Sequence, residues 1–436
     1  TARLHYDTAT RALRGTMNID RMDVQALLAL ANQKEDRLTG QITSVVRLGG
    51  TLDNPSISLT GEIAEGSLAS YPVRDVALDV TLADRVLTVR KLAGEQGGGS
   101  FSAVGTVDFD GLANVDVTGT DIALGIFTRF AGVEEDVTGT TSLTLHIGGH
   151  TQNPEADLRM TAKNGGARGA SFDELTGEAQ LRSSIIHLNN LTVTKYIDGI
   201  AYAASAHGTL PLRALTAERS ENLSAYEEIN LTIALDNADL SLLPVFSDHV
   251  EWALGRTEGS LKLHGTLAAP RLDGTVRVTG GALKVKYLEN PVTDMQIQID
   301  ALGDSVVVRS CTGRMGAGSY MMTGHMELSG VEPTDYDFTL VMNDLAIKTT
   351  FFDGPLSGSL HLTEDEYWGE TLPKLAGTIN IDRALISIPS IPDTNDELPH
   401  IILDVGLTVD RHVHFFSANL YDIHPSGYVH FGGTTH

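Results

Sequence analysis

Apolar and polar residues alternate along one stretch after another of this chain, and this pattern constrains its fold more than any other feature. At 228–236 the sequence EINLTIALD places Ile229, Leu231, Ile233 and Leu235 on one side of an extended backbone and polar residues on the other. A period of two is typical of β-strands that have one apolar and one wetted face. The pattern therefore predicts an all-β protein built on sheets with two unlike faces.

The same alternation recurs across the chain and defines one set of apolar positions. The chain is 42% hydrophobic but only 6% aromatic, so this set is aliphatic in character. Besides the four residues above, we expect the following to line a common apolar face: Ile57, Leu59, Leu143, Leu145, Ile147, Leu158, Met160, Leu261, Leu263, Val276, Val278, Met295, Ile297, Ile299, Ile379 and Ile381.

A glycine-to-proline stretch of six residues appears three times, as GTLDNP at 50–55, GHTQNP at 149–154 and GTLAAP at 265–270. Glycine accepts backbone conformations that other residues avoid, while proline cannot donate to a sheet ladder. Each stretch is flanked by alternating segments. We therefore interpret it as a turn between two successive strands, and not as a binding motif.

The turns belong to a longer repeat of about a hundred residues, which is a period typical of extended repeat architectures. An Asp followed by an apolar, possibly helical stretch begins at Asp23, Asp121, Asp239 and Asp344, and each Asp is a candidate helix cap. A glycine that we interpret as opening a strand follows each stretch, at Gly40, Gly139, Gly259 and Gly358. The predicted units are the end of a preceding repeat with a short helix at 1–39, then 40–138, 139–258 with a loop insertion at 216–228, 259–357, and a truncated unit at 358–436.

Charge and composition exclude several classes of function. The formal net charge is -25, which would repel nucleic acid and a bare anionic membrane surface. Cys311 is the sole cysteine, so an intrachain disulfide is impossible and the redox compartment stays open. The first residues do not resemble a signal peptide, and no apolar run is long enough for a membrane helix. The abrupt ends lead us to expect a piece of a longer protein.

No stretch predicts a cofactor, a metal site or a catalytic group, so we expect a protein that is not an enzyme. His412 and His414 share a strand face with Asp410, and His424 and His430 follow, but we interpret these histidines as residues of a wetted face. GRMGAG at 313–318 lacks the helix that a phosphate-binding loop needs. The carboxylates do not form isolated apolar-flanked pairs for general acid and base work.

The ordered succession of these segments resembles the TamB family, relatives of the AsmA-like bridge proteins that transfer lipid. The resemblance rests on the order in which a predicted strand, a turn, a second strand and a short further segment follow one another. Examples of these segments are SFDELTGEAQL at 171–181, GTLPL at 208–212 and GALKV at 281–285. It covers essentially the whole chain, although no single motif is specific.

The resemblance implies an elongated, repetitive β-sheet curled into a half-open trough (a β-taco), apolar inside, with short helices at the rim. It implies a periplasmic segment of a protein anchored in the inner membrane of a diderm bacterium. The implied partners are phospholipid acyl chains in the groove and an outer-membrane barrel of the BamA type (TamA-like), reached through parts outside this chain. The implied function is phospholipid transport and outer-membrane biogenesis.

Two other interpretations stay open from the residues. A structural or adhesive β-solenoid with a filled core would show the same alternation and would bind protein partners on its outer face. The second of these interpretations is a polysaccharide-active β-helix, although the sequence lacks the aromatic platforms and clustered carboxylates that are typical of such enzymes.

Overall fold

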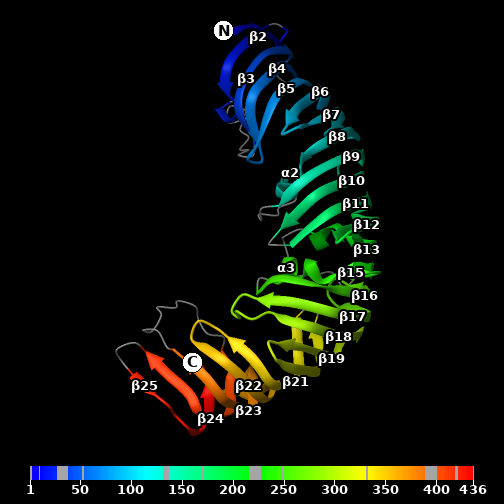
Figure 1. The fold of residues 1–436 in the computed structure, drawn as a ribbon. Coiled ribbons are helices and arrows are strands. Elements are labelled where there is room, and N and C mark those ends of the chain that lie inside the picture. The colour runs from blue at the N-terminus through cyan, green and yellow to red at the C-terminus, as the bar shows by residue number, and fades with distance from the viewer. Residues whose placement is uncertain are drawn as a thin grey trace. The chain divides into compact units, whose positions relative to one another are not determined.

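The chain folds almost entirely into β-strands, as the alternation predicts. The computed structural model describes residues 2–8, 10–26, 38–51, 54–130, 137–167, 170–215, 227–247, 249–329, 332–387, 400–417 and 421–435. Its 26 strands form open sheet structure with only short helical segments between them (Figure 1). The expected all-β class, with a sheet that is not closed, is confirmed.

The chain divides into two compact units. The first comprises Thr1–Ala167, Ser171–Tyr196 and Ser205–Asn222, and the second comprises Arg168–Ala170, Ile197–Ala204 and Leu223–His436. The proposed division into repeats of about a hundred residues is a finer one, and it stays a prediction.

The first unit contains twelve strands and one α-helix. They are β1 (Ala2–Asp7), β2 (Ala12–Asp23), β3 (Leu38–Gly50), β4 (Pro55–Leu68), β5 (Tyr71–Ala83), β6 (Val86–Gln96), β7 (Gly99–Asp108), β8 (Ala113–Ala123), α2 (Leu124–Phe130), β9 (Thr138–His150), β10 (Asn153–Ala167), β11 (Ala170–Arg182) and β12 (Ile185–Ile197). The two units share β13 (Ile200–Pro211), which the short helix η1 (Leu212–Leu215) follows.

The second unit contains the remaining strands. They are β14 (Glu228–Ala234), β15 (Ala238–Asp239), β16 (Val250–Thr266), β17 (Pro270–Val285), β18 (Val292–Gly303), β19 (Ser305–Met315), β20 (Gly318–Ser329), β21 (Glu332–Lys348), β22 (Phe352–Tyr367), β23 (Glu370–Ile386), β24 (Ile402–Ser417), β25 (Tyr421–Ile423) and β26 (Gly427–Thr434). Two short helices, η2 (Leu240–Leu242) and α3 (Leu243–Phe246), precede β16.

Successive strands pair with each other in nearly every case. From β1 to β10 each strand is antiparallel to the next, and the same holds from β16 to β23. Two places depart from this order. Both β14 and β15 pair antiparallel with β16, and β24 runs parallel to β23 and then pairs antiparallel with β25 and β26. Neighbouring strands are thus mostly joined by short turns, which keeps the chain's contacts local.

The three glycine-to-proline stretches are turns, as predicted. They join β3 to β4, β9 to β10 and β16 to β17. In the first turn Gly50 has φ +75, and a Cβ there would lie 2.3 Å from the carbonyl oxygen of Asn54. Only glycine fits this close approach of backbone to backbone.

The four Asp residues predicted to cap helices have two different roles. Asp239 caps η2 by accepting a hydrogen bond of 2.8 Å from the Ser241 N–H, and Asp23 accepts one of 2.7 Å from the Gln25 N–H. Asp121 and Asp344 instead lie within β8 and β21, at positive φ, where each strand's register with its neighbour shifts. The helix α2 still follows Asp121, whereas β21 continues past Asp344. Most of the apolar stretch after Asp23 lies outside the described residues, as does most of the predicted 216–228 insertion.

The glycines predicted to open strands lie inside them, and for two of them the prediction is plainly wrong. Gly259 is in the middle of β16 and Gly358 is in the middle of β22, with φ of +142 and +148. A Cβ at either position would lie 2.0 Å from a carbonyl oxygen of the adjacent strand. These glycines therefore allow two strands to approach closely, which alternation alone does not reveal.

The buried core of each unit is small and lies toward one end of the strands. In the first unit it comprises Ile19, Val24, Ile42, Val46, Ile63, Val73 and Val76. In the second it comprises two clusters, Met315, Met342 and Leu345, and Ile381, Ala384 and Val413. Many other residues of each apolar face are only partly buried, and this incomplete burial is the basis of the candidate site.

Candidate functional site

An unbroken row of aligned residues crosses the first unit on its apolar side. Residues directly opposite each other in paired strands point to the same face of a sheet. Following the printed register from β1 to β10 gives one row with a residue in each of ten strands. The row is Ala2, Met17, Val46, Leu59, Val80, Val89, Gly105, Val115, Ile147 and Ala156.

Two parallel rows flank this one. The first is Ser44, Gly61, Leu78, Leu92, Ala103, Val117, Leu145 and Leu158, and the second is Leu48, Ile57, Leu82, Leu87, Val107 and Ala113. Nearly every member is aliphatic or glycine. We call the side of the sheet that carries these three rows the aliphatic face of the first unit.

The second unit repeats the arrangement. One row again has a residue in each of ten strands, from β16 to β24 and then β26: Thr257, Val278, Ile297, Cys311, Met322, Leu340, Leu360, Gly377, Val405 and Phe431. A neighbouring row runs Gly259, Val276, Ile299, Val308, Gly324, Phe338, Leu362, Leu375 and Leu403. These rows form the aliphatic face of the second unit.

In β4 and β9 of the first unit, burial changes along the strand, so that the aliphatic face is closed toward one end and open toward the other. In β4, Ile63 is 2% exposed, Leu59 is half-buried and Ile57 is 36% exposed, although all three share a face. In β9, Leu143 is 5% exposed while Leu145 and Ile147 are half-buried. The helix α2 begins near the closed end of β9. These two strands thus present an aliphatic surface that their own neighbours do not fully cover.

The residues predicted to line an apolar face lie on these two faces. The buried ones are Leu143, Ile229, Val278, Met295 and Ile381. Ile57 is exposed, and the others are half-buried: Leu59, Leu145, Ile147, Leu158, Met160, Leu231, Ile233, Leu235, Leu261, Leu263, Val276, Ile297, Ile299 and Ile379. Leu235 lies just past the end of β14, and its N–H donates to the Gly259 carbonyl oxygen over 2.8 Å.

The structure adds residues that the sequence analysis did not single out. In the first unit these include Val46, Val80, Val89, Val115 and Val117, and in the second Met322, Leu340, Leu360 and Val405. The same alternation marks them, for example in VALDVTLA at 76–83. A count of period-two matches across the whole chain would have found them.

One pair of titratable groups lies on the aliphatic face of the second unit. The Cys311 sulfur is 3.8 Å from the Tyr320 hydroxyl oxygen. Burial raises the pKa of the Cys311 thiol, and burial together with the thiol raises the pKa of Tyr320 above its ordinary value. Both groups are therefore held neutral, as suits an apolar surface.

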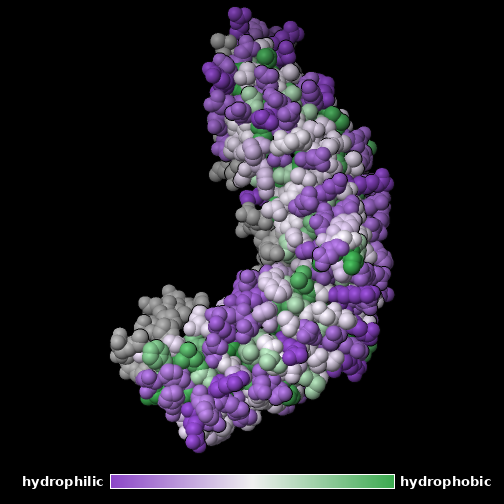
Figure 2. Space-filling view, in the orientation of Figure 1, coloured by the Kyte–Doolittle hydropathy of each residue, from purple (hydrophilic) through white to green (hydrophobic). Residues whose placement is uncertain are grey.

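The opposite face of each sheet is hydrophilic, and Figure 2 shows hydrophilic residues predominating on the side turned to the viewer. Cross-strand hydrogen bonds and ion pairs join neighbouring strands there. In the first unit Asp116 Oδ1 lies 2.8 Å from His146 Nδ1, and Arg182 donates two bonds of 2.8 Å to Asp157. In the second unit, a bond of 2.7 Å from His264 lowers the pKa of Asp273.

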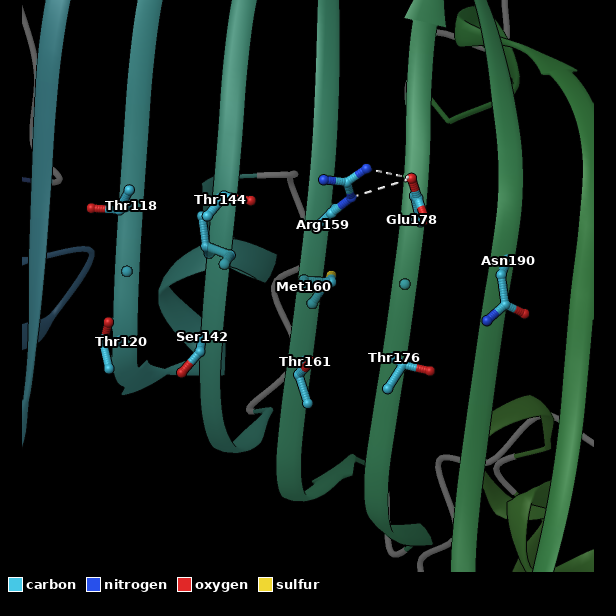
Figure 3. A pocket seen from close by; sticks show the side chains of 13 residues that line it. Thr118, Thr120, Ser142, Thr144, Arg159, Met160, Thr161, Thr176, Glu178 and Asn190 are labelled. Carbon is cyan, nitrogen blue, oxygen red and sulfur yellow. Dashed lines mark hydrogen bonds and ion pairs between the residues drawn. The ribbon is translucent and has the colours of Figure 1, made fainter.

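A shallow depression of about 580 Å³ lies on the hydrophilic side of the first unit, over β8 to β12. Figure 3 shows its hydroxyl-bearing side chains on neighbouring strands, with Arg159 donating to Glu178 over 3.1 to 3.2 Å. Its polar lining is Thr118, Thr120, Ser142, Thr144, Arg159, Thr161, Thr176, Glu178 and Asn190. The depression therefore presents hydroxyl and amide groups beside one ion pair, between Arg159 and Glu178.

The histidines near the C-terminal end are exposed or half-buried, as expected for a wetted face, and three of them lie beside carboxylates. His412 lies 3.6 Å from Asp410, and His430 bonds to Asp404 over 2.9 Å. His414 is joined by Asp422 and His424, which come from β25 and the residue after it. The phase of residues along one strand groups His412 with His414, but it does not show which residues of the next strand lie opposite them.

Within the described ranges, no helix has the length and apolar character needed to cross a membrane. No family model matches the chain, and no solved structure matches it. A segment of 174 residues is 23% identical to Protein SUBSTANDARD STARCH GRAIN 4, chloroplastic, from Oryza sativa subsp. japonica. This match covers 39% of the chain and 8% of the rice protein, so the chain corresponds to a small part of that protein's length.

Proposed function

We propose that this chain shields lipid acyl chains on the aliphatic faces of its two units and so carries lipid along the sheet. The observation that supports the proposal is the continuity of the aliphatic rows across ten strands in each unit, combined with the partial exposure of most of their members. A filled core would bury such residues almost completely, because core side chains are packed on all sides.

The dimensions suit an acyl chain. Ten strands spaced about 4.8 Å apart give a row about 43 Å long. Half the hydrocarbon thickness of a bilayer, the reach of one acyl chain, is about 15 Å. One row can therefore accommodate an acyl chain at several positions along the sheet.

The energy is also sufficient. Burying an acyl chain releases about 0.8 kcal/mol per CH₂, so a tail of about sixteen carbons gains on the order of ten kcal/mol when it is well covered. Aliphatic contacts have no preferred register, because they lack directional hydrogen bonds. A lipid would thus be held along the row without being fixed at one point.

The resemblance to the TamB family supports the wider part of the proposal. In that setting the chain is a periplasmic segment of a protein anchored in the inner membrane. The cargo is phospholipid on its way between the two membranes for outer-membrane biogenesis, and an outer-membrane barrel of the BamA type is the partner. The rice protein's name refers to starch grains and the chloroplast, and a match over 8% of its length does not carry that setting to this chain.

Site-specific photo-crosslinking tests the proposal directly. A benzophenone amino acid replaces Leu231 on the aliphatic face, and a matched control replaces Thr232, the next residue of β14, whose side chain points to the opposite face. The purified proteins are irradiated with vesicles of phosphatidylethanolamine and phosphatidylglycerol, and lipid adducts are measured by mass spectrometry.

We expect lipid adducts at position 231 and few at position 232. Lipid extraction of the purified chain, read by mass spectrometry, should also recover phospholipid. Equal labelling of both positions, or no adduct and no extracted lipid, would contradict the proposal. The latter result would instead favour the structural or adhesive solenoid.

A further inference from the structure

Three side chains with metal-binding atoms converge on the hydrophilic side of the second unit, where β24 pairs with β25. His414 lies in β24, Asp422 in β25 and His424 one residue beyond β25. One ligand atom of each lies within 4.8 Å of the others. We propose that these three residues bind a divalent transition-metal ion of the Zn²⁺ or Cu²⁺ class.

The register of the two strands brings the group together. Phe415 is opposite Ile423 and Phe416 is opposite Asp422 in this antiparallel pair, which places His424 across from His414. Their rings are stacked, with centroids 4.7 Å apart and planes inclined by 10°. Asp422 Oδ1 lies 2.5 Å from His414 Nε2. Neighbouring strands thus present two imidazoles and a carboxylate side by side.

The geometry is close to that of a coordination shell. With metal–ligand bonds of about 2.0 to 2.1 Å, the ligand atoms of a tetrahedral site lie about 3.4 Å apart. Separations of up to 4.8 Å must shrink by about 1.4 Å at most, and the 2.5 Å between His414 Nε2 and Asp422 Oδ1 must lengthen by about 0.9 Å. Rotation of partly exposed side chains can supply both changes. The ion would replace the proton between His414 and Asp422, and water would complete the shell.

The donor set selects the class of metal. Imidazole nitrogens favour Zn²⁺, Cu²⁺ and Ni²⁺ over Mg²⁺ and Ca²⁺, which prefer shells of oxygen. The formal net charge of -25 raises the local concentration of cations around the chain. Bound metal would clamp β25 to β24. The site lies away from the aliphatic face, since Val413, between His412 and His414 in sequence, packs into the apolar cluster.

Calorimetric titration of the chain with ZnCl₂ and electron paramagnetic resonance with CuCl₂ test the site in the wild type and in His424→Gln and Asp422→Asn. His430→Gln is the matched control. The His430 imidazole also bonds to a carboxylate on the paired strand, that of Asp404, but it lies outside the group of three ligands. Circular dichroism confirms that each variant is folded.

We expect one binding event whose affinity falls at least about tenfold in His424→Gln and in Asp422→Asn and is unchanged in His430→Gln. The wild-type Cu²⁺ spectrum should show nitrogen ligation that His424→Gln weakens. Zn²⁺ should slow amide exchange in 421–423 of the wild type and of His430→Gln, and much less in His424→Gln and Asp422→Asn. Binding that is equal in all four proteins, or is lost equally in His430→Gln, would overturn the proposal.

Discussion

The gradient of burial along β4 leads to a quantitative prediction about Ile57 and Ile63. The two residues share a strand and an aliphatic face, but Ile57 is 36% exposed and Ile63 is 2% exposed. Replacing each with alanine removes the same three carbons from the same type of backbone. Differences in β-propensity therefore cancel, and only the surroundings distinguish the two variants.

The expected costs follow from burial. Three carbons at about 0.8 kcal/mol each are worth about 2.4 kcal/mol when fully buried. Ile63→Ala also leaves a cavity among its packed neighbours, so we expect a loss of about 3.5 kcal/mol. Ile57→Ala loses about two-thirds of the transfer energy and leaves no cavity, since its surroundings open to solvent, so we expect about 1.5 kcal/mol.

The suitable assay is amide hydrogen exchange, measured by mass spectrometry on peptides from β4 and β5. An extended repeat opens locally before it unfolds as a whole, and this method detects local opening. The difference of about 2 kcal/mol corresponds to an opening equilibrium about 30-fold larger in Ile63→Ala than in Ile57→Ala. Equal protection in the two variants would refute the reasoning, because it would mean that the aliphatic face is covered uniformly along the strand.

Three further predictions concern the backbone and the titratable groups. Gly358→Ala should lower the free energy of unfolding in urea by more than about 2 kcal/mol, because Gly358 has a positive φ and lies against a carbonyl oxygen of the adjacent strand. Gly98 has open space around it, so Gly98→Ala should be nearly neutral. Equal effects of the two substitutions would contradict this reasoning. Burial raises the pKa of Cys311, so the native chain contains less thiolate at pH 8 than the unfolded chain. Iodoacetamide should therefore label Cys311 far more slowly in the native chain than in the unfolded chain. Equal labelling rates would count against the burial of Cys311. Lys374 lowers the pKa of Asp365, so this carboxylate stabilises the fold above the unfolded pKa near 3.8 and loses that effect as pH falls through the lower folded value. Asp365→Asn should therefore reduce stability slightly at pH 6 and not at pH 2, as measured by urea unfolding, and an equal loss at both would show that charge is not the cause.

Local pattern predicted much of the fold because its causes are local. Alternation fixes which side chains of a strand share a face, as the paired Leu145 and Leu158 illustrate. Glycine and proline placed the turn at 50–55 for steric reasons that act within a few residues. The role of Asp239 as a helix cap also depends only on its own neighbours.

Features that depend on a second strand could not be predicted from local pattern. Gly259 and Gly358 resemble the first residues of strands in the sequence, but the constraint on each is a carbonyl oxygen of the adjacent strand. Asp121 and Asp344 resemble helix caps in sequence, yet they sit at shifts of register with the following strand. The meeting of His414 with His424 is of the same kind, because it requires the pairing of β24 with β25.

By itself the sequence determined that the chain is all-β, that its strands carry an aliphatic side, and that short turns join many of them. These follow from side-chain alternation and from the steric limits of glycine and proline, which every extended chain obeys. Only the tertiary structure decided that the rows align across ten strands in each unit and that their burial falls from Ile63 to Ile57. Register and coverage depend on which strands meet, and alternation is the same for a filled core as for an open face.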